Sequence, residues 1–296
     1  MHVRVYSLIT SVHPDKMQWL VDCARSVLTQ RLPEGWELQW LLMVDGGGPQ
    51  SGERVLAQLQ GLPNLHAAYV GSLSRQRGIA CARNLALSQA CGELIRALDA
   101  DDELPEDVLI HDIEAMEAHP EALWCASSCY NLDKDGNLDG WLDPPAGWIA
   151  RGQLGVWWEG RGQRGEHEEP EVLPVHPISF CIRAAWLRAL GGWMGVAPGG
   201  EETGLVLALS EIGPGWFIDQ PGLHYRIWGE SSTKHPEFGT AEARGAAWAA
   251  THRLRAIREL QQMGVWPRFE APSGSLSVAS PLPSEAPEPS SGPAGA

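Results

Sequence analysis

Three carboxylates lie within the segment Leu98-Asp99-Ala100-Asp101-Asp102, directly after an apolar run. Carboxylates this close repel one another unless a cation balances their charge. Hard divalent cations prefer carboxylate oxygens, and Mg²⁺ usually binds through one or two of them together with phosphate. The segment therefore predicts a cation site that serves a phosphate-bearing ligand. A solvated turn that caps a helix near Pro105 is the alternative.

Three arginines, Arg75, Arg77 and Arg83, lie upstream of these carboxylates. An Arg-Gly pair at a helix start suits an anionic or planar ligand, because guanidinium groups and helix N-terminal amides both bind anions. Surface arginines on an acidic protein are the alternative interpretation. The run Gly46–Gly48 is not a Walker loop, because no Gly-Lys-Ser/Thr follows it.

Alternating apolar runs and helical patterns in the first 130 residues must position these groups. This alternation predicts a parallel sheet flanked by helices. Ligands of such sheets bind at the carboxyl ends of the strands, where Asp45 and Asp99 fall. The predicted strands are Val3–Ile9, Leu38–Val44, Leu65–Val70, Leu94–Leu98 and Leu123–Tyr130, and the intervening helices centre on Met17–Leu28, Val55–Leu59, Ile79–Ala90 and Leu109–Met116.

The pattern breaks down between Gly136 and His176, where Gly, Pro, Trp and charged residues predominate. Long stretches of this kind are usually functional or disordered, and the Trp content favours a binding loop. The last 26 residues, Ala271 to Ala296, are mostly Pro, Ser, Gly and Ala, which predicts a disordered tail. Ordered patterning is predicted at Ile178–Ile182, Ala184–Leu190, Glu202–Leu209 and Glu242–Met263.

The composition excludes several classes of protein. The 296 residues include 22 basic and 37 acidic side chains, and a net charge of −15 argues against nucleic acid as a partner. No apolar run approaches the roughly 20 residues that span a bilayer, so no transmembrane segment is expected. The N-terminus does not resemble a signal peptide, and the six cysteines form no CxxC pair. We expect a cytoplasmic protein and leave open a peripheral position at a membrane.

The order of these motifs resembles glycosyltransferases of family two, which have the GT-A fold. The resemblance covers residues 3 to 235, and it is specific because many elements recur in order. The matching elements are Ser26-Val27-Leu28-Thr29-Gln30, Met43-Val44-Asp45-Gly46-Gly47, Gly78 to Asn84, Leu98 to Asp102, Gly191-Gly192-Trp193, Glu201-Glu202-Thr203-Gly204-Leu205 and Tyr225-Arg226-Ile227-Trp228.

The resemblance implies an α/β GT-A fold: a Rossmann-like, mostly parallel central sheet flanked by helices, with an irregular acceptor-side region. One domain would span residues 1–268. Its nucleotide-sugar-binding half would be 1–130 and its acceptor and catalytic half 131–235. A C-terminal helix would follow at 240–264, and the disordered tail at 271–296.

The implied activity is metal-dependent, inverting transfer of a sugar from a nucleotide-diphospho-sugar, with a UDP-sugar expected, to an acceptor hydroxyl. The acceptor is open: a natural product, a glycan, a peptide or a lipid-linked molecule. Mn²⁺ or Mg²⁺ would neutralise the departing diphosphate, and a separate carboxylate would deprotonate the acceptor. By the motifs, the donor would be bound by Thr10, Ser11, Asp45, Arg77, Arg83 and Asp99, the metal by Asp101 with Asp99, and the catalytic base would be Glu202 or Glu201.

Three positions depart from the family pattern: Val44 replaces an Asp, Glu202 replaces the catalytic Asp, and Trp228 replaces a His. These departures support an alternative function, a catalytically impaired homologue that binds a nucleotide sugar or a carbohydrate. A sugar-1-phosphate nucleotidyltransferase ranks lower. Such an enzyme would carry a Gly-rich basic loop after the first strand, where this chain has Thr10-Ser11-Val12-His13-Pro14.

Overall fold

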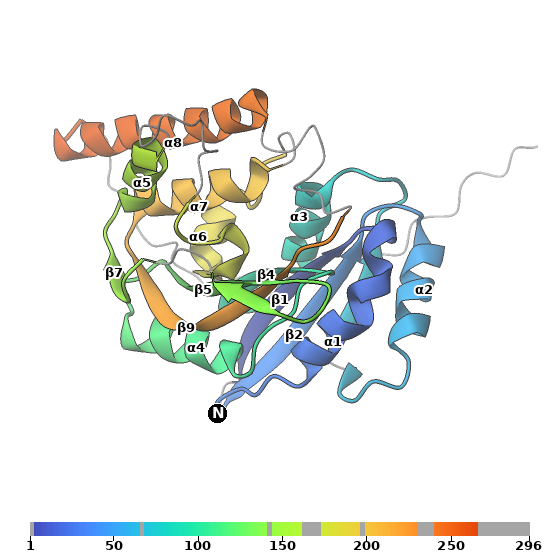
Figure 1. Ribbon diagram of the computed structural model, residues 1–296. Helices are drawn as coiled ribbons and strands as arrows, with labels where there is room; N and C mark the ends of the chain where they lie inside the picture. Colours follow the sequence, from blue (N-terminus) through green and yellow to red (C-terminus); the bar gives the residue numbers. More distant parts are fainter. Residues whose placement is uncertain are drawn as a thin grey trace, which may run out of the picture.

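The computed structural model describes residues 3–65, 68–140, 144–161, 173–195, 199–229 and 240–265 (Figure 1). The predicted tail at 271–296 lies outside the described residues, as do parts of the stretch from Gly136 to His176. Among the described residues, no helix is long and apolar enough to cross a membrane.

A nine-stranded sheet forms the centre of the described structure, in the order β3-β2-β1-β4-β8-β5-β9-β7, with β6 paired to β5. Six strands (β1 to β4, β5 and β9) share one direction, because β8 is antiparallel to both β4 and β5 and β9 is parallel to β5. This confirms the predicted mostly parallel α/β sheet. The bounds are β1 (Arg4–Val12), β2 (Trp36–Val44), β3 (Ala68–Ser72), β4 (Leu94–Asp99), β5 (Trp124–Leu132), β6 (Leu138–Gly140), β7 (Gly147–Ile149), β8 (Phe180–Arg183) and β9 (Gly215–Arg226).

Helices flank this sheet, and the last of them, α8, packs against α7 (Figure 1). The first predicted helix begins as a 3₁₀ helix, Pro14–Trp19, which continues directly into α1. The helix bounds are α1 (Leu20–Leu28), α2 (Pro49–Leu59), α3 (Ile79–Gln89), α4 (Val108–Ala118), α5 (Gln153–Arg161), α6 (Ala184–Ala189), α7 (Glu201–Ile212) and α8 (Ala241–Gln262), with a further 3₁₀ turn at Pro177–Ser179.

The stretch from Gly136 to His176 contains regular elements that its composition does not predict. The described residues include the short strands β6 and β7 and the helix α5. The strands are only three residues long, too short for a period-two pattern to be recognised.

Strand β9 is the largest element that the sequence pattern misses. It contains Pro221-Gly222, and its pairing with β5 shifts register on either side of Ser128. A Cβ at Gly222 would collide with Ser127, so the close approach of the two strands requires glycine there. The interrupted alternation explains why a pattern search does not detect the strand.

A buried polar network ties β9 to the middle of the sheet. Arg96 of β4 is fully buried and pairs with Asp112 of α4 at 2.8 Å, while Tyr6 donates to the same carboxylate at 2.7 Å. Arg96 Nη2 also donates to the carbonyl of Gly222 at 2.5 Å. Breaking such a network would leave a buried charge uncompensated, so it fixes β9 strongly against β4.

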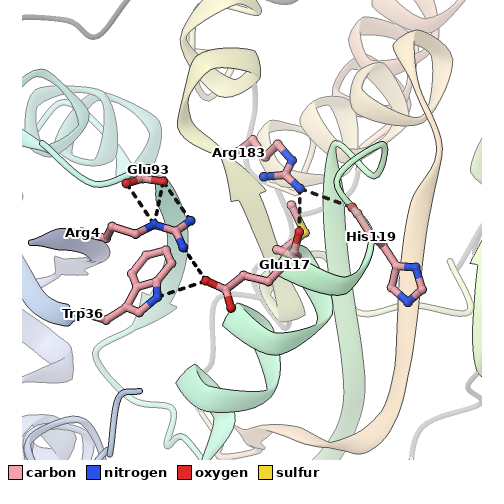
Figure 2. A network of polar contacts seen from close by, with 7 residues as sticks. Arg4, Trp36, Glu93, Glu117, His119 and Arg183 are labelled. Carbon is pink, nitrogen blue, oxygen red and sulfur yellow. Dashed lines mark hydrogen bonds and ion pairs between the residues drawn. The ribbon is translucent and has the colours of Figure 1, made fainter. Parts of the chain in front are cut away.

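A second polar cluster lies at the edge of the sheet where the parallel strands begin (Figure 2). Arg4 lies over the ring of Trp36 and pairs with Glu93 at 3.0 Å and with Glu117 at the end of α4. Arg183 donates to the carbonyl of His119 at 3.2 Å. These half-exposed contacts join β1, β2 and α4 at the edge opposite the carboxyl ends of the strands, and each adds little to stability.

Helix α7 is anchored at its C-terminal end by the fully buried Glu211. Arg255 and Arg258, one turn apart on α8, reach the Glu211 carboxylate at 3.0 and 2.9 Å. Arg255 also pairs with Glu159 of α5 at 2.6 Å. Arg255 of α8 therefore joins the Glu211 carboxylate of α7 to the Glu159 carboxylate of α5.

Candidate active site

The predicted site residues gather where β1, β2 and β4 end. Asp45 follows β2 directly, and Asp99 is the last residue of β4. Ser11 of β1 lies opposite Asp99 in the sheet register. Parallel register thus brings three polar residues, separated along the chain, to one edge of the sheet.

Asp45 is almost fully buried and fixes the loop before α3. Its two carboxylate oxygens accept hydrogen bonds from the backbone amides of Arg77 and Gly78, at 2.7 and 2.9 Å. Gly46 adopts a left-handed φ of 108°, and a Cβ there would meet the Gln76 backbone at 2.9 Å. The Arg77 side chain is exposed. Asp45 therefore holds the Arg77 loop at the site.

Thr10 and Ser11 differ in their access to the site. Thr10 is fully buried, and its hydroxyl accepts a hydrogen bond from the Trp40 indole at 3.0 Å. Ser11 is 5% exposed, and among the described residues its hydroxyl has no hydrogen-bond partner. A buried hydroxyl without a partner is costly, so Ser11 is the better placed of the two to contact a ligand.

Arg83 of α3 connects two of the predicted site carboxylates. Its side chain is fully buried, and its two terminal nitrogens contact Asp99, at 2.5 Å, and Glu202. Burial alone would raise the pKa of Asp99, but the positive charges of Arg83 and Lys16 hold it below its ordinary value. Asp99 is therefore ionised at neutral pH, and a single guanidinium group joins it to Glu202.

Glu201 and Glu202 form the first turn of α7, where negative charge is favourable. Glu201 is 5% exposed, and its Oε2 has no hydrogen-bond partner within the described ranges. Burial raises the pKa of Glu201, and the backbone amides of residues 199–201 and Arg83 offset only part of that shift. Glu201 therefore holds a proton more tightly than an ordinary glutamate.

Asp101 contacts a lysine and a tryptophan. Lys16 Nζ lies 3.0 Å from both carboxylate oxygens, and Trp228 Nε1 donates to Oδ2 at 3.0 Å. Burial opposes the charged form of Lys16, but Asp99 and Asp101 more than offset it and raise the pKa of Lys16. The acidic loop thus already contacts one positive charge.

The rest of the acidic loop is held by the end of β9. The backbone amide of Arg226 donates to the Asp102 carboxylate at 2.9 Å. The side-chain Nε of Arg226 donates to the backbone carbonyl of Asp101 at 2.8 Å. The guanidinium group also contacts Glu103 and lies 4.3 Å from the ring centre of Trp19. Burial, together with Asp101 and Asp99, raises the pKa of Asp102 well above its ordinary value.

Motif reasoning missed Lys16 and Trp19 and assigned no role to Arg226. Lys16 lies in the 3₁₀ helix immediately after β1, and it is one of three lysines in the chain. The scarcity of lysine in this chain and the position of Lys16 beside a predicted strand end could have indicated it as a site residue. Trp19 lies against Trp228, with ring centres 6.5 Å apart, a contact between distant segments that spacing does not reveal.

The buried His176 completes the surroundings of Asp99. Burial lowers the pKa of His176 to about 4, with the Asp99 charge opposing that shift. The imidazole is therefore neutral at neutral pH and packs against Tyr225 at 4.7 Å. Among the described residues, no three His, Cys, Asp or Glu side chains are arranged to hold a metal ion by themselves. Two carboxylates that share a cation with phosphate remain compatible with that observation.

The fold and site define an α/β protein with charged and hydroxyl groups at the carboxyl ends of its strands, the position at which this class binds nucleotides. The model of Glycosyl transferase family 2 matches residues 7–188, which is more than half of the chain. The chain therefore belongs to glycosyl transferase family 2, the family that the sequence motifs resemble.

Solved structures support the fold. The crystal structure of S. aureus TarS 1-349 is 14% identical, with a TM-score of 0.57 over 86% of this chain and 65% of that chain. The structure of the same protein with UDP-GlcNAc gives 13% identity and a TM-score of 0.58, over 86% of this chain and 66% of that chain. The complex with UDP gives 0.55. This chain thus spans slightly less than two thirds of those chains, and the likeness confirms the fold. No curated protein matches the chain significantly.

Proposed function

We propose that the protein transfers a sugar from a nucleotide-diphospho-sugar to an acceptor hydroxyl, with inversion at the sugar carbon. The observation that carries this proposal is the Arg83 contact with both Asp99 and Glu202. Asp99 ends the strand beside which the donor would lie, and Glu202 lies in the first turn of α7, on the acceptor side. One guanidinium group therefore holds a donor-side and an acceptor-side carboxylate close together, which supports a base placed beside the bound donor.

The donor half would be residues 1–130, and the acceptor half residues 131–235. Ser11 and the Arg77 loop would contact the nucleotide, with Asp45 holding that loop through two backbone amides. We place Thr10 beneath this surface, because its hydroxyl is already bonded to Trp40. The structures of TarS with UDP and with UDP-GlcNAc support a UDP-sugar as the donor.

A divalent cation, Mn²⁺ or Mg²⁺, would bind at Asp101 and Asp99. The residues fit such an ion, because the ammonium group of Lys16 already lies 3.0 Å from both oxygens of Asp101. One Asp102 oxygen also lacks a hydrogen-bond partner among the described residues. When bound, the cation would neutralise the charge that develops on the diphosphate. The protein residues would orient the donor and exclude water from it.

Glu202 would accept the proton of the acceptor hydroxyl, a step that typically contributes about 10²–10⁴-fold. Its contact with Arg83 holds the carboxylate in place beside Asp99. Glu201 is the alternative base, because burial raises its pKa and one of its oxygens lacks a partner within the described residues.

A second candidate function is nucleotide-sugar binding without transfer. The contacts of Asp101 with Lys16 and of Glu202 with Arg83 favour it, because both carboxylates already have a cationic partner within the protein. Slow hydrolysis of a bound sugar nucleotide to its nucleoside diphosphate would exclude this candidate.

The first test of the proposed function is calorimetric titration with UDP, GDP and dTDP, each with and without Mn²⁺. We expect UDP to bind with Mn²⁺ present, and Asp101→Ala to lose this cation-dependent binding. Asp135→Ala is the matched control, because Asp135 is exposed and pairs only locally, with Lys134 at 3.0 Å. Failure of all three nucleotides to bind would overturn the proposed function, and unchanged binding by Asp101→Ala would overturn the metal assignment.

A further inference from the structure

The lysine at the acidic loop comes from a different part of the chain. Lys16 belongs to the 3₁₀ helix after β1, whereas Asp101 follows β4. The side chains of Lys16 and Asp101 are only 15% and 5% exposed, so water screens their contact poorly. The contact is symmetric, with both carboxylate oxygens 3.0 Å from Nζ. This is a built contact, unlike the exposed pair of Lys134 and Asp135.

The other cations near the loop have different targets. Arg83 contacts Asp99, and Arg226 contacts Glu103 and the backbone carbonyl of Asp101. Within the part of the chain that the structure describes, Lys16 alone supplies a positive charge to the Asp101 carboxylate. Its ammonium group therefore occupies the position between the two carboxylate oxygens, where a metal ion held by both oxygens would lie.

We propose that Lys16 is a resident competitor at the cation site, so that a divalent metal ion binds Asp101 only by displacing the Lys16 ammonium group. This inference rests on the proposed function, because it takes Asp101 as a metal ligand. Mg²⁺ lies about 2.0–2.1 Å from its oxygen ligands, so an ion placed between the two oxygens of Asp101 would collide with the Lys16 nitrogen, which lies 3.0 Å from both of them. Release of Lys16 is therefore part of metal binding.

The diphosphate of the donor would give the displaced ammonium group a new partner. Metal and nucleotide then favour each other's binding, because the metal ion releases the ammonium group and the diphosphate gives that group a new partner. The 3₁₀ helix also carries Trp19, which lies against Arg226 and Trp228, and Trp228 donates to Asp101. Displacement of Lys16 would therefore also affect Trp19, Arg226 and Trp228, which contact one another around the acidic loop.

The test measures Mn²⁺ affinity by electron paramagnetic resonance, without nucleotide, for the wild type, Lys16→Met and Lys16→Arg. A hydrogen bond to a charged group contributes about 1.5–3 kcal/mol, so Lys16→Met should bind Mn²⁺ about tenfold or more tightly than the wild type. Lys16→Arg keeps the charge and should bind Mn²⁺ as the wild type does. Lys134→Met is the matched control and should change nothing, because Lys134 pairs only with the exposed Asp135.

Equal or weaker Mn²⁺ binding by Lys16→Met, with binding still lost in Asp101→Ala, would overturn the inference and leave the metal site intact. Absence of Mn²⁺ binding in every protein, with and without UDP, would overturn both the inference and the metal assignment.

A second measurement does not depend on the folding of Lys16→Met. In the wild type labelled with ¹³C at lysine Cε, Mg²⁺ with UDP should shift the Lys16 signal and leave that of Lys134 in place. Lys16→Arg assigns the signal, and an unmoved Lys16 signal would overturn the inference.

Discussion

Two acidic regions of the molecule face each other, and they differ in how their charge is balanced. In the loop of residues 99–103, Asp99, Asp101 and Glu103 each contact a basic side chain, namely Arg83, Lys16 and Arg226. At the start of α7, Glu202 shares Arg83 with Asp99, whereas Glu201 is buried and keeps one oxygen without a partner in the described part of the chain.

The difference separates two kinds of chemistry. A loop whose carboxylates already pair with basic side chains suits the exchange of one cation for another. A buried carboxyl with a raised pKa suits the gain and loss of a proton. Similar acidic residues therefore acquire different properties from burial and from the cations beside them.

The largest effect is expected from Arg83→Met, which removes a buried residue that contacts both acidic regions. Removing one partner of a buried ion pair typically costs about 3–5 kcal/mol, and we expect a loss of unfolding free energy of that size. Urea denaturation measures it. Arg188→Met is the control, because Arg188 is partly exposed and donates to a backbone carbonyl. Equal losses in both variants would contradict a special role for Arg83.

Glu202→Gln and Glu201→Gln sharpen the assignment of the base. If Glu202 accepts the acceptor proton, Glu202→Gln should lower the transfer rate at least about 10²-fold and leave donor affinity unchanged. Release of nucleoside diphosphate from a bound sugar nucleotide measures the rate, and calorimetry measures the affinity. The reverse result, with Glu201→Gln the damaging change, would move the base by one residue.

The smallest expected effect is on stability and concerns pH. The folded protein holds the Glu201 proton more tightly than the unfolded chain, so this group's contribution to stability falls as pH rises from the unfolded pKa through the folded pKa. Glu201→Gln removes that loss, and it should raise Tm at neutral pH by about 2–4 °C per kcal/mol. Thermal melts of both proteins from about pH 4 to about pH 8 would test this. A Tm difference that does not grow with pH would contradict the assignment.

The sequence predicts the first half of the sheet well, because β1, β2 and β4 are long apolar runs bounded by helical patterns. It misses β9, because Pro221 and Gly222 interrupt the alternation and the register shift beside Ser128 cannot be recognised from spacing. The apolar runs of β1, β2 and β4 therefore made the mostly parallel architecture predictable, whereas β9, which supplies Arg226, could not be predicted.

The motifs select most of the candidate site carboxylates but do not reveal their partners. Asp45, Asp99 and Asp101 could be proposed from strand ends, whereas the Lys16–Asp101 contact joins residues 85 apart in the chain. Nor does the sequence distinguish the buried Thr10 from the more accessible Ser11, because both lie at the end of one strand. Contacts between distant segments determine which side chain of a motif reaches the ligand.

The anchoring of α7 through Glu211 has a consequence for any attempt to shorten the protein. A chain cut before Arg255 would lose both arginines and leave the fully buried Glu211 carboxylate without them. The damage would then reach α7, whose opposite end carries Glu201 and Glu202. Helix α8 thus stabilises the acceptor side through its two arginines, and a shortened protein should end beyond Arg258.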